Sequence, residues 1–122
     1  MKSQQNIFGG AGGGALLEEL RRGSIGTMPW PSTPAAFVAV WDHWRAGDRA
    51  AATRVFEERL APLQRLVAPG LGGGHLLHKE LLRRQGVIAS AHVRRPADDV
   101  EPPFWEELDE VCERLGLGGA AT

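Results

Sequence analysis

The β-strand pattern of this chain is confined to the stretch before Pro31, and this limits the possible folds more than any other feature. Residues 6–9 are typical of a strand end, and Ser24–Met28 of a second short strand. Between them, Ala15–Arg22 predicts a short helix whose leucines share one face. Two short strands seldom hold together alone, and a strand–helix–strand unit is normally part of a larger α/β fold. We therefore expect an α/β fragment that is cut before residue 1.

From residue 32 onward the sequence predicts helices. Thr33 can cap the first of them, and Pro34 fits its first turn. Pro62 interrupts the apolar stripe of the second helix and should kink or split it. A third helix is expected over His75–Gln85 and a last one from Pro103. Apolar stripes support these helices, formed by Phe37, Val40, Trp41 and Trp44, by Phe56, Leu60, Leu63 and Val67, and by Phe104, Leu108, Val111, Cys112 and Leu115.

The expected chain is thus mostly α, with two short parallel strands followed by a C-terminal helical region. We divide it into an α/β portion at residues 1–31, a helical region at residues 32–117 and a flexible tail at residues 118–122.

Composition excludes several functional classes. The net charge of −1 gives no electrostatic reason to expect nucleic acid or an anionic membrane as a partner. The single cysteine, Cys112, cannot form an internal disulfide and is expected to pack on an apolar helix face, which fits the reducing cytoplasm. The first six residues lack the apolar core of a secretory signal. We therefore expect a cytoplasmic protein.

A glycine run, Gly9–Gly14, follows the first strand candidate. It lacks the Lys-Ser/Thr pair of a phosphate-binding P-loop. Gly10–Ala15 does match the G-x-G-x-x-G/A pattern of dinucleotide-binding folds, but Trp30 stands where the ribose-binding acid should fall. The structural alternative is a tight turn at which the backbone comes close to another part of the protein. A further alternative is a set of backbone N–H groups that bind a substrate carboxylate or hydroxyl.

Two other clusters have structural interpretations. His75 and His78 are spaced i, i+3 near Glu80, but no third ligand is placed, so we expect a surface or helix-capping role and no metal site. The basic pairs Arg83-Arg84 and Arg94-Arg95 lack the broad basic field of a nucleic-acid site. We expect salt bridges from both pairs to the acidic segment at residues 98–113.

Taken in order, the segments resemble one family. The residues from Phe8 to Pro29 are similar to the seventh strand, seventh helix and eighth strand of the dihydrodipicolinate synthase / N-acetylneuraminate lyase family. Trp44–Ala50, Leu60–Leu63 and Lys79–Gly86 with Arg94-Arg95-Pro96 resemble the helices that follow the barrel in that family. The resemblance covers residues 7–117 and includes the in-helix proline.

The resemblance implies a (β/α)8 barrel, which needs roughly 250 residues, and a lyase acting on pyruvate or related 2-keto acids. In that family a lysine on the sixth strand forms a Schiff base with the substrate, and a tyrosine relays protons. Backbone at the ends of the last two strands lines the pocket. The residues that match this backbone, and our candidate substrate-binding residues, are Gly9, Gly10, Ala11, Gly26, Thr27 and Met28.

The catalytic residues of the family have no match here. The chain contains no tyrosine, Lys2 is too close to Gly9 to lie on the preceding strand, and Lys79 matches the helical region. Where the lysine-pathway synthase has two acidic residues, this chain has Gly10 and Ala11, which favours sugar-acid or other 2-keto acid substrates. We therefore expect a C-terminal lyase fragment that has no catalytic residues or cofactor and is inactive alone.

Two alternatives remain from the sequence. The helices of Thr33–Leu115 could form a non-catalytic assembly module, since apolar faces without a barrel would seek a partner. The glycine turn could bind a dinucleotide. The expected protein partner is a second copy of the chain or a missing N-terminal half.

Overall fold

The computed structural model describes residues 6–66 and 70–117. The chain divides into two compact units, with the boundary between Ala61 and Pro62. Each unit has its own cluster of buried apolar side chains. The division expected after residue 31 separates the strand–helix–strand portion from the helices that follow it, and it stays a prediction. The expected tail at residues 118–122 lies outside the described residues.

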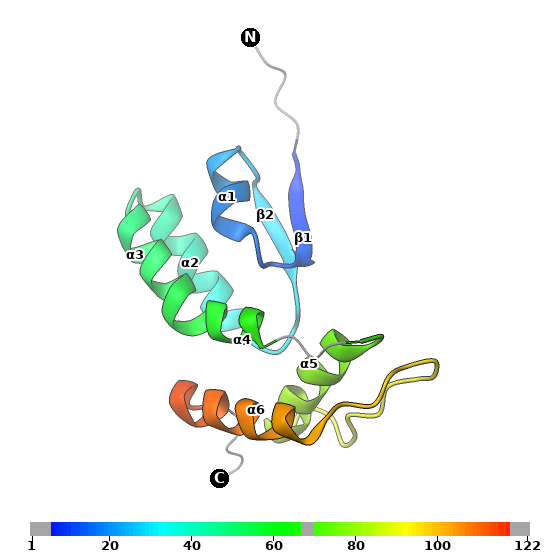
Figure 1. Cartoon of the computed structure of the whole chain (residues 1–122). Coiled ribbons are helices and arrows are strands. Elements are labelled where there is room, and N and C mark those ends of the chain that lie inside the picture. Colours follow the sequence, from blue (N-terminus) through cyan, green and yellow to red (C-terminus); the bar gives the residue numbers. More distant parts are fainter. Residues whose placement is uncertain (1–5, 67–69, 118–122) are drawn as a thin grey trace. The chain divides into compact units, whose positions relative to one another are not determined.

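The first unit begins with a strand–helix–strand segment, as the sequence predicted (Figure 1). It consists of β1 (Phe8–Gly12), α1 (Leu16–Arg21) and β2 (Gly26–Pro29), and the two strands pair in parallel. Both strands lie later in the sequence than expected, because pairing continues into the glycine run and through Pro29. A proline fits at this position because an edge strand need not donate every backbone N–H.

Two helices follow in the first unit, α2 (Pro34–Arg45) and α3 (Arg49–Val55), and they pack against each other. Pro34 lies in the first turn of α2, as expected, but the Thr33 side chain makes no capping hydrogen bond. In α3 the side chain of Asp48 accepts a hydrogen bond from the Ala51 N–H at 2.9 Å. That bond satisfies one of the four backbone donors left open at a helix start.

The helix does not break at Pro62. A π-helical segment, η1 (Phe56–Leu60), follows α3 directly, and α4 (Ala61–Arg65) continues from it. The Ala61 N–H donates to the Phe56 carbonyl, one residue further back than in an α-helix. A proline ring clashes with the carbonyl of the preceding turn, and a π turn is one way for a helix to accommodate it. The expected kink is therefore a local change of helical pitch.

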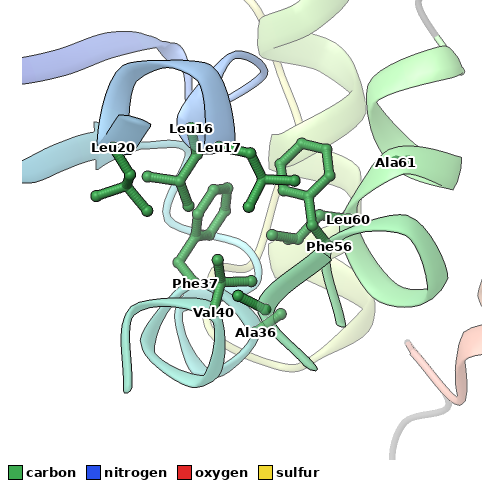
Figure 2. Packing of buried hydrophobic residues seen from close by; sticks show 10 residues of the cluster. Leu16, Leu17, Leu20, Ala36, Phe37, Val40, Phe56, Leu60 and Ala61 are labelled. Atoms are coloured by element: carbon green, nitrogen blue, oxygen red, sulfur yellow. The ribbon is translucent and has the colours of Figure 1, made fainter. Parts of the chain in front are cut away.

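Buried side chains of α1, α2, α3 and η1, with Ala61 at the start of α4, form the core of the first unit (Figure 2). Val40 and Ala52 are fully buried members of this core. Trp41 and Trp44 are partly buried against this core, and the Arg45 and Arg49 guanidinium groups lie over their rings. The core residues are Leu16, Leu17, Leu20, Ala36, Phe37, Val40, Ala52, Phe56, Leu60 and Ala61.

The second unit is built around α5 (Gly73–Arg84) and α6 (Pro102–Leu115). Residues 86–101 between them contain no helix or strand, as predicted for residues 87–96. The core comprises Leu63, Leu66, Leu77, Leu81, Phe104, Leu108 and Cys112. Cys112 is 4% exposed, and this burial raises the pKa of its thiol. The expected packing role of Cys112 is confirmed.

Candidate functional site

The candidate substrate-binding residues lie on β1 and β2. Gly9 pairs with Thr27, and Phe8 pairs with Gly26, whereas the register shifts between Gly9 and Gly12. Paired residues of neighbouring strands point to the same side of a sheet, and successive residues point to opposite sides. The candidates can therefore be assigned to the two faces of the sheet.

One face carries Gly9 and Thr27 and is covered by α1. A Cβ atom added to Gly9 would overlap the carboxylate of Glu19 on that helix. The Oε2 atom of Glu19 and the Oγ1 atom of Thr27 are both buried and have no hydrogen-bond partner. The Thr27 side chain is thus directed into the layer between sheet and helix, and only its backbone is left to contact a ligand on the other face.

The opposite face carries Gly10, Gly26 and Met28, together with Phe8. A Cβ atom at Gly10 would have no heavy atom within 4 Å, and the Met28 and Phe8 side chains are 71% and 57% exposed. A Cβ atom at Gly26 would stand only 2.7 Å from the Phe8 ring. This open face therefore offers bare backbone beside two exposed apolar side chains, and the six candidates do not form a single wall.

Ala11, the sixth candidate, lies in a tight turn. The Gly13 N–H donates to the Gly10 carbonyl at 3.0 Å, and Ala11 and Gly12 have φ values of 52° and 72°. Cβ atoms at Gly12 and Gly13 would overlap the Trp30 indole and the Phe37 ring. The close approach expected of this turn is confirmed, and the approaching groups are the chain's own aromatic rings. Dinucleotide binding stays a prediction.

Neither of the two lysines lies on β1 or β2 within the described residues. Lys79 is on α5, where its Nζ donates to the His92 carbonyl at 2.9 Å, and Lys2 lies outside the described residues.

His78 is only 8% exposed, so the expected surface role is wrong for this residue. Burial, and secondarily the nearby His75, lower the pKa of His78 to about 4. Among the residues described, no cluster of three or more His, Cys, Asp or Glu side chains could hold a metal ion.

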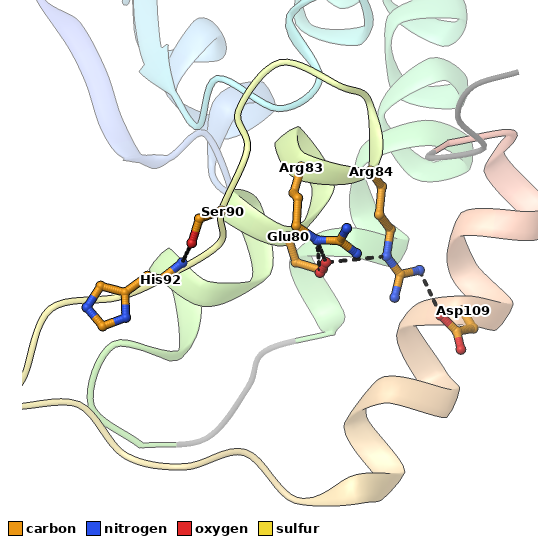
Figure 3. A network of polar contacts seen from close by, with 6 residues as sticks. All are labelled: Glu80, Arg83, Arg84, Ser90, His92 and Asp109. Carbon is orange, nitrogen blue, oxygen red and sulfur yellow. Dashed lines mark hydrogen bonds and ion pairs between the residues drawn. The ribbon is translucent and has the colours of Figure 1, made fainter.

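The basic pairs divide between ion-paired and unpaired arginines. Arg84 binds Asp109 at 2.7 Å and Arg95 binds Asp99 at 2.9 Å, as expected for contacts to residues 98–113. Arg83 instead pairs with the buried Glu80 on its own helix, at 2.5 Å, and this hydrogen bond raises the pKa of Arg83 (Figure 3). Arg94 makes none of the salt bridges expected of it within the described part of the chain.

Comparison with known proteins supports the family resemblance at the level of structure. No family model and no curated protein matches this chain. Among solved structures, the chain is similar to the dihydrodipicolinate synthase of Rhodopseudomonas palustris, with 29% sequence identity and a TM-score of 0.78. The likeness covers 90% of this chain and 36% of that one. The chain is therefore similar to a partial, C-terminal portion of a lyase of this type, and it spans about a third of that enzyme's length.

No helix within residues 6–66 and 70–117 combines the length and the apolar character that crossing a membrane needs.

Proposed function

We propose that this chain is the C-terminal part of a lyase that acts on pyruvate or related 2-keto acids. The observation that carries this proposal is the likeness to a dihydrodipicolinate synthase over 90% of the chain. In this reading β1, α1 and β2 complete a (β/α)8 barrel, and the open face of their sheet faces the barrel interior. Backbone at Gly10 and Gly26, beside Met28, would then form part of the substrate pocket.

The chain alone should be inactive. Schiff-base chemistry needs an amine nucleophile that is activated in a pocket, and a proton relay beside it. The chain has no tyrosine, and Lys79, on α5 of the second unit, is hydrogen-bonded to the His92 carbonyl. Lys2 precedes Gly9 too closely to lie on an earlier strand. We propose that both catalytic residues come from another polypeptide segment.

The substrate class is proposed from the end of β1. Gly10 and Ala11 stand where the lysine-pathway synthase has acidic side chains, and a Cβ at Gly10 would meet nothing within 4 Å. The position therefore leaves room for a longer substrate and supplies no acid. This supports a sugar acid or another 2-keto acid, handled by an aldolase or a dehydratase.

The partner is proposed to be a strand-bearing polypeptide, a missing N-terminal half of the barrel. A two-stranded sheet is marginal by itself, and its outer edges present backbone groups that further strands can pair with. Exposed Phe8 and Met28 would be buried by such a partner.

The same exposed side chains support a second candidate function, a non-catalytic assembly module. Light scattering tests this candidate: a homo-oligomer would favour it, and a monomer would count against it.

Borohydride trapping with pyruvate tests the proposed inactivity. We expect the intact mass of the chain to remain unchanged after reduction, because neither lysine occupies the position that the chemistry requires. Lys79→Arg and Lys2→Arg are the matched variants. An adduct on the unmodified sequence that disappears in one of them would contradict the inactivity and identify the reactive lysine.

Co-expression tests the proposed partner. The upstream part of the Rhodopseudomonas palustris enzyme, which lies outside the structural match, is produced together with this chain. We expect the two to co-elute and pyruvate to be trapped on the upstream part. Met28→Asp should abolish co-elution, whereas Val38→Asp, at a side chain 55% exposed on α2, should not. Absence of both co-elution and trapping would contradict the proposal.

A further inference from the structure

The second unit contains a pocket of about 410 Å³ beside the first half of α5. Its lining includes Leu71, His75, Lys79, Val93, Arg94 and Pro96. Lys79 and Arg94 are cationic, and the imidazole of His75 can donate a hydrogen bond. No acidic side chain lines the pocket. The remaining walls are apolar. The pocket lies within residues 71–96 and is independent of the sheet in the first unit.

The position of the Lys79 ammonium is fixed by the fold. His75 and Lys79 are one helical turn apart on α5, so their side chains share a face of that helix. Lys79 Nζ donates to the His92 carbonyl at 2.9 Å, which ties the loop at residues 86–101 to the helix. A lysine ammonium has three N–H donors, so this bond leaves two of them for a ligand.

Arg94 supplies a second permanent charge. Its guanidinium has no hydrogen-bond or ion-pair partner among residues 6–66 and 70–117. An arginine has five N–H donors in a planar fork that matches carboxylate and phosphate oxygens. Gly72, the residue that precedes the first turn of α5, also lines this pocket, and the N-terminal dipole of a helix favours negative charge.

In a neighbouring pocket of the same loop, an arginine is ion-paired with an aspartate. That pocket, of about 460 Å³, shares Gly72 and Val93 with the first and is lined by Arg95, Asp98 and Asp99. Arg95 binds Asp99 at 2.9 Å, and Asp98 accepts the Leu71 N–H at 2.8 Å. Asp98 and Asp99 are thus bound by the Leu71 backbone and by Arg95, and neither lines the first pocket, where the described residues give Lys79 and Arg94 no acidic partner.

We propose that the pocket formed by Leu71, His75, Lys79, Val93, Arg94 and Pro96 binds a small organic dianion, either a dicarboxylate or a phosphomonoester. Two permanent cations match two negative charges, and charge-assisted hydrogen bonds from Lys79 and Arg94 hold the anionic oxygens. Leu71, Val93 and Pro96 contact the carbon body of the ligand. The pocket is large enough for a molecule of this size.

Calorimetric titration of the whole chain with succinate and with glycerol 3-phosphate tests this site, with acetate and glycerol as monoanionic and neutral controls. Arg94→Gln should weaken dianion binding about tenfold, the equivalent of one lost charge-assisted hydrogen bond. This variant removes no hydrogen bond or ion pair within the described residues, and residue 94 is exposed, so its unfolding midpoint should be unchanged. Lys79→Gln should weaken binding similarly, and circular dichroism reports whether it loosens the loop.

Arg95→Gln is the matched control, because Arg95 is adjacent in sequence but lines the other pocket and is ion-paired with Asp99. It should bind dianions as the parent chain does. The preferred probe distinguishes a carboxylate site from a phosphate site. The proposal is overturned if neither dianion binds, if Arg94→Gln binds as the parent does, or if Arg95→Gln weakens binding equally.

Discussion

The backbone of Gly13 lies directly against the Phe37 ring, so that a Cβ atom at residue 13 would overlap the Cε1 and Cζ atoms of that ring. Phe37 is 6% exposed and belongs to the core of the first unit. Gly13 also has a φ of 79°, a conformation that side chains with a Cβ rarely adopt. The glycine is required by both its conformation and its neighbour, and it lets the start of α1 pack against α2.

Gly13→Ala should destabilise the chain by about 3 kcal/mol, the sum of the left-handed strain and of overpacking against Phe37. Gly23→Ala is the matched control, because Gly23 has a φ of 93° but no atom within 4 Å of its missing Cβ. It should cost only about 1 kcal/mol. Urea unfolding followed by circular dichroism measures both. Equal losses in the two variants would show that the Phe37 contact contributes nothing.

The sequence indicated a close backbone approach at the glycine run, but it could not identify the approaching group. Phe37 and Trp30 come from later segments, and local spacing carries no information about which ring packs on which turn. Helices were predicted more closely, since an apolar stripe depends only on neighbouring turns. The helix around Pro62 was the exception, because a proline predicts disruption but not whether a helix breaks or widens into a π turn.

The candidate site was only partly predictable for a similar reason. Alternation along a strand separates Gly10 and Met28 from Gly9 and Thr27, but the sequence does not say which face a helix covers. In the structure α1 covers the Gly9 face, and the carboxylate of Glu19 on that helix lies over Gly9. Glu19 is a charged residue that a sequence pattern assigns to the solvent side of a helix.

Thr27→Val should stabilise the chain by about 1 kcal/mol. The Thr27 hydroxyl is buried without a hydrogen-bond partner, and replacing it by a methyl group removes that desolvation cost at nearly constant shape. Valine also suits a strand. Thr27→Ser is the control, since it keeps the hydroxyl and loses the methyl group, and it should destabilise. If Thr27→Val lowers the free energy of unfolding, the hydroxyl has a partner in solution.

Glu80→Gln should destabilise the second unit by about 2 kcal/mol, because the buried carboxylate accepts from Arg83 Nε at 2.5 and 3.1 Å and lies 3.9 Å from Arg84 Nε. The amide keeps the shape, but one of its two terminal atoms donates where a carboxylate oxygen accepts, and the negative charge beside both arginines is lost. Asp99→Asn is the control: this side chain is 91% exposed in its pair with Arg95, so the change should stay within about 0.5 kcal/mol. Thermal unfolding compares the two, and a similar shift in both would argue against a special role for Glu80.

His78 should make the stability of the chain depend on pH in a defined window. Burial, and secondarily His75, hold its folded-state pKa at about 4, below the ordinary value of 6.5. Between these two values the unfolded chain binds a proton that the folded chain does not, so stability falls as the pH drops from 6.5 toward 4 and the loss levels off below. The loss attributable to His78 is on the order of 2 kcal/mol, since partial solvent screening reduces the full linkage value.

His78→Gln isolates this effect, because glutamine retains hydrogen-bonding groups but does not titrate. The free energy of unfolding, measured in urea across the window from pH 4 to 6.5, should fall less steeply for this variant than for the parent chain. The difference between the two slopes is the informative quantity, because all other titratable groups are common to the two chains. His92→Gln, at an exposed side chain, should retain the parent slope. If His78→Gln also retains it, then His78 is protonated in the folded chain as readily as in the unfolded one, and its burial does not set the acid sensitivity of the second unit.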